Sequence, residues 1–354
     1  MKKIKNITSA IIFLVIVGTL LSIVSYVAIP YHVLKKQVGL YENEPKNSID
    51  VAFIGSSSTF RYYDNMAIWD EYNITSMTYN IADMPFDYTI PMIDLIQQRQ
   101  SPQVYVIDLR SIVDDEYSQK YYGFYEDTNY MDSYIRALDL QRNFGAKLPW
   151  VYRNDYVEDE EYMYMFSILH NHSSFVDGVK FLLENEHFSA FKGNENMVFM
   201  QKDMTEEYVD FTTESVDDTY ELTRATIDRM NELFEFAKEN NLNLHFTFTP
   251  YVGSRNMYDS EIRNSICKLV EENGFSIVDY KKEFKEIDLD LELDFYDDSH
   301  TNAVGAKKYT MYFMVDLLEL YPVSAEHNND IVSNWNDEFI EWIEFSNNQN
   351  MQQL

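Results

Sequence analysis

Two short groups of residues in this chain have types and spacings that suit nucleophilic catalysis. The first is a Gly-Ser-Ser-Ser-Thr turn at residues 55–59, directly after an apolar run at residues 49–54. Glycine lets the backbone turn sharply, and a serine just beyond it can present its hydroxyl above the end of a strand. The unpaired N–H groups at a helix start suit a developing oxyanion. The alternative is that these serines only cap a helix.

The second group is an Asp-x-x-His motif, Asp297 and His300, directly before the last helical pattern. An aspartate at this spacing can reach the imidazole, fix its tautomer and stabilise the imidazolium that forms when the other ring nitrogen accepts a proton. Each group alone is common by chance. Together they favour a Ser-His-Asp site, because one follows the first core strand and the other precedes the last core helix. Both can therefore reach one edge of a sheet.

The patterns between these groups predict a mostly parallel sheet covered by helices on both faces. We expect strands at residues 49–54, 76–81, 104–109, 242–249 and 275–279, and helices at residues 60–72, 87–99, 215–240, 260–273 and 303–320. Strands that alternate with helices of this length are typical of the α/β class. The predicted fold is a flavodoxin-like three-layer αβα sandwich, in which reactive groups gather at the carboxyl ends of the strands.

The chain divides into four predicted parts. These are a cytoplasmic N-terminus and membrane anchor at residues 1–30, a polar stalk at 31–48, the α/β domain at 49–322, and a polar tail at 323–354 with one helix near 334–345. An acidic, Tyr-rich insertion at about 117–214 interrupts the alternation. Its length excludes a structureless loop, so we expect a largely helical insertion. Two roles for the insertion remain open: a lid over the site, or an extension of the scaffold with no catalytic consequence.

The N-terminal apolar run predicts a single membrane span. Residues 7–29 contain no charged side chain, and this length crosses a hydrocarbon core of about 30 Å. Lysines at positions 2, 3 and 5 favour a cytoplasmic N-terminus, with everything after Pro30 outside the cell membrane, although lysines at positions 35 and 36 weaken this bias. A secretory signal peptide has a shorter apolar region, about 7–15 residues. No clear cleavage site follows, so we interpret the run as an uncleaved anchor.

Composition excludes several classes of partner and cofactor. The 28 basic and 59 acidic residues give a net charge of −31, so nucleic acid is not a partner by bulk electrostatics. The single cysteine, Cys267, can make no internal disulfide, and its amphipathic helical surroundings predict a buried inert thiol. We expect no cofactor and no metal. The histidines at positions 170, 172, 187, 245 and 327 are interpreted as packed or solvated residues.

The two groups resemble the motifs of the SGNH (GDSL-like) hydrolase superfamily. In that superfamily a serine follows the first strand in a Gly-Asp-Ser-like turn, and Asp-x-x-His stands before the last helix. The resemblance implies that Ser57 is the nucleophile, His300 the base and Asp297 its orienting carboxylate. It covers residues 49–320 in layout, although its motifs occupy only a small part of that span.

Members of this superfamily share short sequence motifs, called blocks and numbered in chain order. The second and third blocks form the oxyanion hole, and both differ in this chain. The second block supplies a glycine N–H in the superfamily, and Ala82 takes its place as the expected donor in this chain. The third block is Gly-x-Asn-Asp, whose asparagine donates to the oxyanion. No asparagine follows the corresponding strand in this sequence, so Arg110, or Asn80 from the second block, is the expected substitute. A missing donor typically costs about 100- to 1000-fold in rate.

Membrane-anchored, extracytoplasmic members of the superfamily share these departures. They include the D-alanylation protein D of teichoic acid synthesis and the SGNH-like proteins of alginate acetylation, which partner membrane-bound O-acyltransferases. The resemblance implies a serine esterase or O-acyltransferase acting on acetyl or alanyl esters of cell-envelope polysaccharide or teichoic acid, with hydrolysis and transfer both open. Two alternatives remain: a catalytically inactive polymer-binding or acyltransferase-partner protein, and an unrelated doubly wound binding protein with a fortuitous triad.

Overall fold

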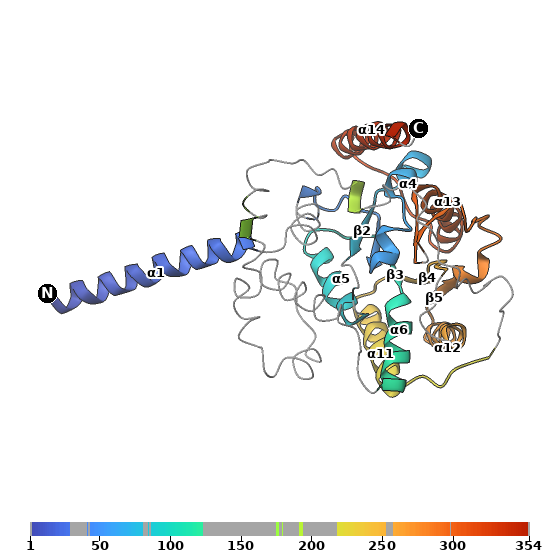
Figure 1. Cartoon of the computed structure of the whole chain (residues 1–354), viewed down its shortest axis with the longest axis horizontal. Helices are drawn as coiled ribbons and strands as arrows, with labels where there is room; N and C mark the ends of the chain where they lie inside the picture. Colours follow the sequence, from blue (N-terminus) through green and yellow to red (C-terminus); the bar gives the residue numbers. More distant parts are fainter. Residues whose placement is uncertain are drawn as a thin grey trace.

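The centre of the molecule is a five-stranded parallel sheet (Figure 1). The computed structural model describes residues 2–28, 41, 43–80, 84, 86–122, 175–176, 179, 191–193, 218–252, 258–297 and 299–352. The strands are β1 (Val51–Gly55), β2 (Ser76–Asn80), β3 (Val104–Asp108), β4 (Leu244–Phe248) and β5 (Ser276–Asp279), in the order β2-β1-β3-β4-β5. All neighbours pair in parallel. This order is the flavodoxin-like one, which confirms the predicted α/β fold.

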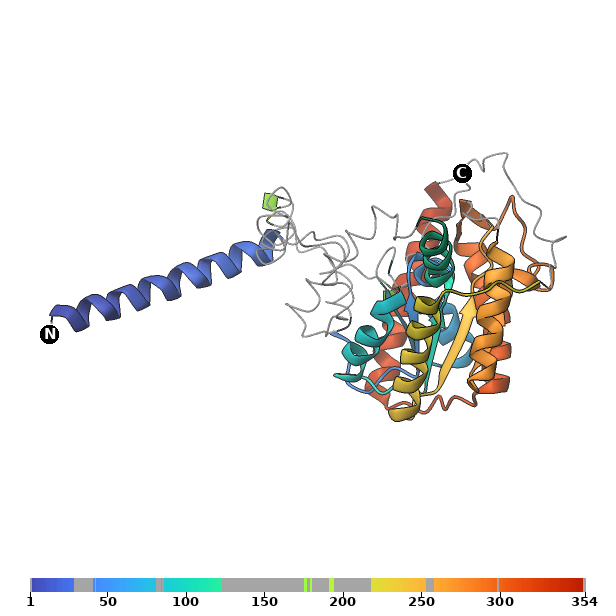
Figure 2. The same ribbon diagram turned by 90° about the horizontal axis from the view of Figure 1, so that it is seen from below.

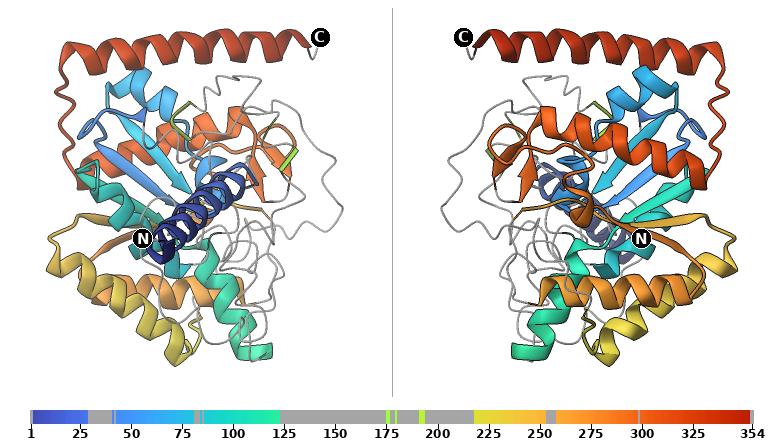
Figure 3. Two further views of the ribbon diagram at one scale, coloured as in Figure 1. Left: turned by 90° about the vertical axis from the view of Figure 1, so that its left-hand side faces the viewer. Right: turned by 90° about the vertical axis from the view of Figure 1, so that its right-hand side faces the viewer.

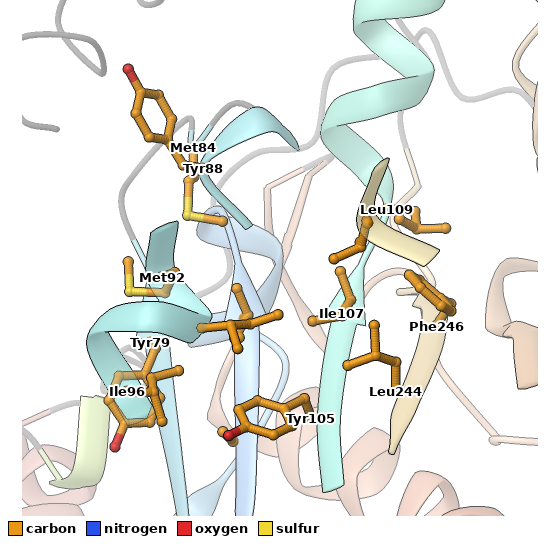
Figure 4. Close-up of a cluster of buried hydrophobic side chains, with 14 of the residues drawn as sticks. Tyr79, Met84, Tyr88, Met92, Ile96, Tyr105, Ile107, Leu109, Leu244 and Phe246 are labelled. Atoms are coloured by element: carbon orange, nitrogen blue, oxygen red, sulfur yellow. The ribbon is translucent and has the colours of Figure 1, made fainter. Parts of the chain in front are cut away.

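Alternate residues of each strand pack into separate cores on the two faces of the sheet. Ala52 and Ile54 of β1 belong to one buried cluster, whereas Val51 and Phe53 belong to the other. Figure 4 shows part of the first cluster, with side chains of β3 and β4 opposite the helix that carries Met92. The parallel sheet is covered on both faces, so all residues of β1 and β3 are buried and these two strands are largely apolar. Strands β2 and β4 also bury polar residues, such as Thr78 and Thr247.

Helices cover both faces of the sheet (Figures 1 and 2). The first cluster contains residues from α5 (Thr89–Gln97), α6 (Arg110–Tyr122), α11 (Arg224–Glu239) and α12 (Asp259–Glu272). The second is closed mainly by α13 (Ala303–Leu320). Helix α14 (Asn329–Gln352) packs beside α4 (Asn65–Tyr72), as both views in Figure 3 show. The predicted tail helix at 334–345 is therefore present and extends further in both directions.

Several predicted elements have different bounds in the structure. The expected helix at 60–72 is two helices, α3 (Ser57–Phe60) and α4, because Asp64 starts a new helix by accepting hydrogen bonds from the backbone N–H groups of Met66 and Ala67. The expected helix at 215–240 begins only at Arg224, where the Thr223 side chain caps it. A small antiparallel hairpin, β6 (Phe295–Asp297) and β7 (His300–Thr301), was not expected.

The N-terminal helix α1 (Lys2–Ala28) is long and apolar enough to cross a membrane. No residue of its Ile7–Val24 segment is buried within the protein. A helix of this kind is compatible with a membrane anchor or with a signal sequence. The membrane itself, the orientation of the helix and the four-part division of the chain remain predictions.

Most of the predicted insertion at 117–214 lies outside the described residues. Its helical content and its role, as a lid or as an extension without catalytic consequence, therefore stay predictions. Its first residues continue α6 to Tyr122. A short 3-10 turn, η5 (Phe191–Gly193), contacts β2. The buried ammonium of Lys192 in this turn lies 2.6 Å from Glu44 and 2.7 Å from Glu338. This residue therefore links the insertion, the segment before β1 and α14.

Candidate active site

The turn after β1 is shaped by close packing around Gly55. A Cβ atom at this position would lie 2.6 Å from Cγ2 of Thr59 and 3.1 Å from Cβ of Asp108. Only glycine therefore fits without movement of its neighbours. The next residue, Ser56, is the N-cap of α3 but makes no side-chain capping hydrogen bond. Its carbonyl instead accepts from the backbone N–H of Thr59 at 3.0 Å. Capping thus does not occupy the Ser56 hydroxyl.

The hydroxyl of Ser57 meets the imidazole of His300 at the carboxyl end of the sheet. The distance from Oγ to Nε2 is 2.8 Å. On the other side of the ring, Nδ1 lies 2.8 Å and 3.0 Å from the two carboxylate oxygens of Asp297. A carboxylate only accepts hydrogen bonds, so Nδ1 carries the proton and Nε2 is the acceptor for the serine hydroxyl. The sequence-predicted histidine therefore lies within hydrogen-bonding distance of both the predicted serine and the predicted aspartate.

The β6–β7 hairpin and α13 together position the histidine and the aspartate. Asp297 and His300 are paired residues of the hairpin. Directly after it, the side chain of Asn302 accepts hydrogen bonds from the backbone N–H groups of Val304 and Gly305, which starts α13. The side chains of His300 and Asp297 are 22% and 28% exposed, so the pair is open to a substrate from solvent.

Hydrogen bonding keeps the carboxylate of Asp297 ionised. Partial burial pushes its pKa upward, but the hydrogen bond and charge of His300 and the backbone N–H of Ser299 outweigh burial. The net result is a pKa below the ordinary aspartate value. An ionised carboxylate on Nδ1 stabilises the imidazolium that a proton transfer to Nε2 creates.

The three predicted oxyanion donors have different surroundings. Asn80, buried at the end of β2, lies in register with Gly55 at the end of β1. The guanidinium of Arg110 donates to Ser299, from Nη1 to the carbonyl oxygen and from Nη2 to Oγ, both at 3.0 Å. Ala82 lies outside the described residues.

Sequence reasoning missed the buried carboxylate of Asp108, which stands at the end of β3. Its Oδ1 accepts from the hydroxyl of Ser58 at 2.5 Å and from the backbone N–H of Arg110 at 3.1 Å. Its Oδ2 accepts from the backbone N–H of Thr249 at 3.2 Å. Burial raises the pKa of Asp108, and these hydrogen bonds act in the opposite direction. The signal in the sequence was an acidic residue that ends an otherwise apolar strand.

The remaining histidines and the cysteine have structural surroundings where they are described. His245 is fully buried with Nδ1 2.9 Å from Ser276 Oγ, and burial lowers its pKa to about 4, so it is neutral. His327 lies 3.0 Å from Asp50. Burial raises the pKa of the Cys267 thiol to about 12. No group of three or more potential metal-ligating side chains occurs among the described residues. The histidines at 170, 172 and 187 lie outside them.

Comparison with known proteins adds little to this geometry. No protein-family model matches the chain, and no curated protein matches it. Four chains of solved structures match. One is an acetyl xylan esterase with 13% sequence identity and a TM-score of 0.38, in an alignment that covers 75% of this chain and 100% of the esterase chain. A similarity this distant carries no argument about activity.

Proposed function

We propose that this chain is an extracytoplasmic serine esterase or O-acyltransferase of SGNH type that acts on acyl esters of cell-envelope polymers. The observation that carries the proposal is the continuous set of hydrogen bonds from Asp297 through His300 to Ser57. These groups are partly exposed and lie at the carboxyl end of a parallel sheet, where such folds bind their ligands. An activated serine in this position suits acyl transfer.

In the first half-reaction Ser57 Oγ attacks the carbonyl carbon of the ester. The hydroxyl proton passes to Nε2 of His300, and the carbonyl π electrons move onto oxygen to give a tetrahedral intermediate. The expected oxyanion donors are the backbone N–H groups of Ser57 and Ala82, with Asn80 or Arg110. When the intermediate collapses, the bond to the leaving alcohol breaks, and the imidazolium gives its proton to that alcohol. An acyl-serine ester remains.

The second half-reaction reverses these roles with a new acceptor. Water or a sugar hydroxyl loses its proton to Nε2 of His300 as its oxygen attacks the acyl-serine carbonyl. Collapse then releases the acyl group as an acid or as a new ester, and the imidazolium returns the proton to Ser57 Oγ. Asp297 stabilises the imidazolium in both halves. The same residues therefore serve hydrolysis and transfer, and the acceptor decides between them.

The substrate class rests on the resemblance to membrane-anchored SGNH proteins and on the apolar N-terminal helix. We propose acetyl or alanyl esters of envelope polysaccharide or teichoic acid as substrates, and a membrane-bound O-acyltransferase as a partner. The anchor at residues 7–29 would hold the domain near such a partner and near polymers at the outer face of the membrane.

A serine-reactive fluorophosphonate probe tests the catalytic claim directly. The full chain in detergent should become labelled, and mapping of the labelled peptide should identify Ser57 rather than Ser56 or Ser58. Ser57→Ala and His300→Ala should each abolish labelling and lower the turnover of p-nitrophenyl acetate and of an O-acetylated glycan by about 1000-fold or more. Ser101→Ala, an exposed serine outside the site, is the matched control and should behave like the wild type. Wild-type turnover in Ser57→Ala would end the proposal.

A non-catalytic role is the second candidate. It is favoured by the absence of the third-block asparagine and by the bonding of the Arg110 guanidinium to Ser299. In that case the domain binds polymer or an acyltransferase through the same fold. Absence of labelling, together with polymer binding that Ser57→Ala leaves unchanged, would support it.

A further inference from the structure

One short turn contacts both halves of the proposed site. Asp108, Leu109 and Arg110 join β3, the central strand, to α6. Asp108 accepts a hydrogen bond from the turn that bears Ser57, and Arg110 donates to the turn that bears His300. This link matters because those two turns belong to segments 243 positions apart, and the β6–β7 hairpin is not part of the main sheet.

On the histidine side, Arg110 holds the residue that lies between base and carboxylate. Its guanidinium donates to the carbonyl oxygen and to Oγ of Ser299, each at 3.0 Å. The phenol of Tyr62 donates to the same carbonyl at 3.0 Å. The backbone N–H of Ser299 donates in turn to Asp297 at 2.9 Å. Ser299, the residue before His300, is therefore held by the side chains of Arg110 and Tyr62 from two other segments of the chain.

The guanidinium is itself fixed by an aromatic ring. Cζ of Arg110 lies 4.4 Å from the ring centroid of Tyr251, within the range of a cation–π contact. Tyr251 is buried, and its hydroxyl donates to Asp259 at 2.5 Å. The planar fork of arginine can reach a carbonyl and a hydroxyl of one residue together, which the single ammonium of lysine does less well. Arg110 is thus held in place to fix Ser299.

On the serine side, Asp108 fixes the turn after β1. Asp108 is 4% exposed as a residue, and a buried carboxylate is stable only when hydrogen bonds satisfy it. One of those bonds comes from Ser58 at 2.5 Å, next to Ser57 in the first turn of α3. Another comes from the backbone N–H of Arg110 at 3.1 Å. The carboxylate therefore joins the nucleophile turn to the residue that holds the histidine turn.

We propose that Asp108 and Arg110 are positioning residues that together set the Ser57–His300 distance. This inference rests on the proposed function, and it gives the residues at the family's third block a role other than supplying an oxyanion donor. A misplacement of about 1 Å between reacting groups can cost about 100-fold in rate. Loss of either side chain should therefore lower turnover without removing a group that touches the substrate.

Amide hydrogen exchange tests the histidine side without any need for activity. In Arg110→Gln the peptide covering residues 295–302 should exchange at least about tenfold faster than in the wild type, because the charged donor to Ser299 is lost. Ser299→Ala, which keeps the carbonyl contact, should show a smaller increase. Arg224→Gln is the matched control, since that exposed arginine pairs with Asp228 in its own helix, and it should leave the peptide unchanged. Unchanged exchange in Arg110→Gln would overturn the proposal.

Steady-state kinetics separates positioning from oxyanion donation. For positioning, Arg110→Gln should lower kcat on p-nitrophenyl acetate by about 10- to 100-fold with KM within about twofold, and Arg110→Lys should recover part of the loss. The double variant Arg110→Gln/Ser299→Ala should be no worse than Arg110→Gln, because the contact with Ser299 Oγ is already lost in Arg110→Gln. A loss of about 100- to 1000-fold with unchanged exchange, and a silent Ser299→Ala, would assign Arg110 to the oxyanion and overturn the proposal.

Asp108→Asn tests the serine side. It should speed exchange in the peptide covering residues 55–61 and slow labelling by a fluorophosphonate about tenfold or more, while leaving the 295–302 peptide less affected. Normal exchange in residues 55–61 would overturn this half. The proposed function has a separate test, because wild-type turnover in Ser57→Ala would refute it. The exchange results would still decide whether Asp108 and Arg110 hold the two turns.

Discussion

Asp297 and His300 face each other across the β6–β7 hairpin, with the carboxylate oxygens 2.8 Å and 3.0 Å from Nδ1. This relationship is local, because the two residues are three positions apart. The contact between His300 and Ser57 instead joins residues 243 positions apart, so it depends on long-range contacts in the folded chain. The orientation of the imidazole and its approach to the serine therefore have separate structural causes.

Replacing Asp297 by asparagine should lower kcat by about 10³- to 10⁴-fold on p-nitrophenyl acetate. An amide in this place no longer favours the tautomer with the proton on Nδ1 and cannot stabilise the imidazolium. The pKa of Asp297 lies below the ordinary aspartate value. Protonation of this carboxylate should therefore not reduce wild-type activity until the pH falls below the pKa of an ordinary aspartate. Glu292→Gln, an exposed change in the preceding loop, is the control. A loss of less than tenfold in Asp297→Asn contradicts the assigned role.

The sheet could be predicted from the sequence because its signals are local. Strand β3, buried on both faces, is a largely apolar run. The expected segments at 76–81, 104–109 and 275–279 agree with β2, β3 and β5 to within a residue at each end. Helix α13, at 303–320, has the predicted bounds. Breaks between consecutive helices were harder to predict from the sequence. The start of α4 depends on the side chain of Asp64, which the apolar pattern does not reveal.

The site could be predicted as far as its motifs extend. The pair Asp297 and His300 follows from its spacing before a helix, whereas the choice of Ser57 among three consecutive serines follows from the resemblance to the SGNH superfamily. The partners of Asp108 and Arg110 could not be read from sequence, because a buried carboxylate or guanidinium is satisfied by residues distant in the chain, such as Ser58 and Ser299. Spacing along the chain indicates local pairs such as Asp297 and His300, but not which polar groups meet through long-range packing.

Gly55→Ala should destabilise the protein by about 1–3 kcal/mol and displace the serine turn, because the new methyl group would lie 2.6 Å from Thr59 Cγ2. Thr59→Ser removes that methyl group and keeps the hydroxyl. The double variant Gly55→Ala/Thr59→Ser should therefore regain part of the stability and of the fluorophosphonate labelling rate that Gly55→Ala loses. Urea unfolding and labelling kinetics measure both. No recovery in the double variant would show that the contact with Asp108, at 3.1 Å, dominates.

The pH dependence of stability should contain a contribution from Asp115. This carboxylate and Asp87 share one guanidinium, with Arg229 Nη1 at 2.9 Å and 3.2 Å from them. Burial raises the pKa of Asp115 to about 7 despite the attraction of Arg229, and the charges of Asp87 and Asp114 add to the rise. The native state therefore holds a proton that the unfolded chain, with a pKa of about 3.9, has released. The stabilising contribution is complete below about pH 4 and is lost as the pH rises to about 7.

Asp115→Asn should remove this dependence. The stability of the variant relative to the wild type should therefore increase between pH 5 and pH 8. The free energy of unfolding of the variant minus that of the wild type should rise by about 2–3 kcal/mol, at about 1.4 kcal/mol per pKa unit. Asparagine keeps an acceptor for Arg229. Denaturant unfolding of the detergent-solubilised chain at the two pH values measures the difference, with the exposed Asp228→Asn as control. A relative stability that is flat with pH, or falls, contradicts the raised pKa.

The N-terminal helix should place the α/β domain outside the cytoplasm. Lysines at positions 2, 3 and 5 precede the apolar run, and cytoplasmic flanks of membrane helices are enriched in basic residues. A C-terminal alkaline phosphatase fusion should therefore be active and a fluorescent-protein fusion dark, with the full-length mass retained in the membrane fraction. Changing the three lysines to glutamine should reduce the phosphatase activity, because lysines at positions 35 and 36 then dominate the charge bias. A fluorescent C-terminal fusion to the unaltered chain contradicts the orientation, whereas release of a shorter product contradicts the anchor alone.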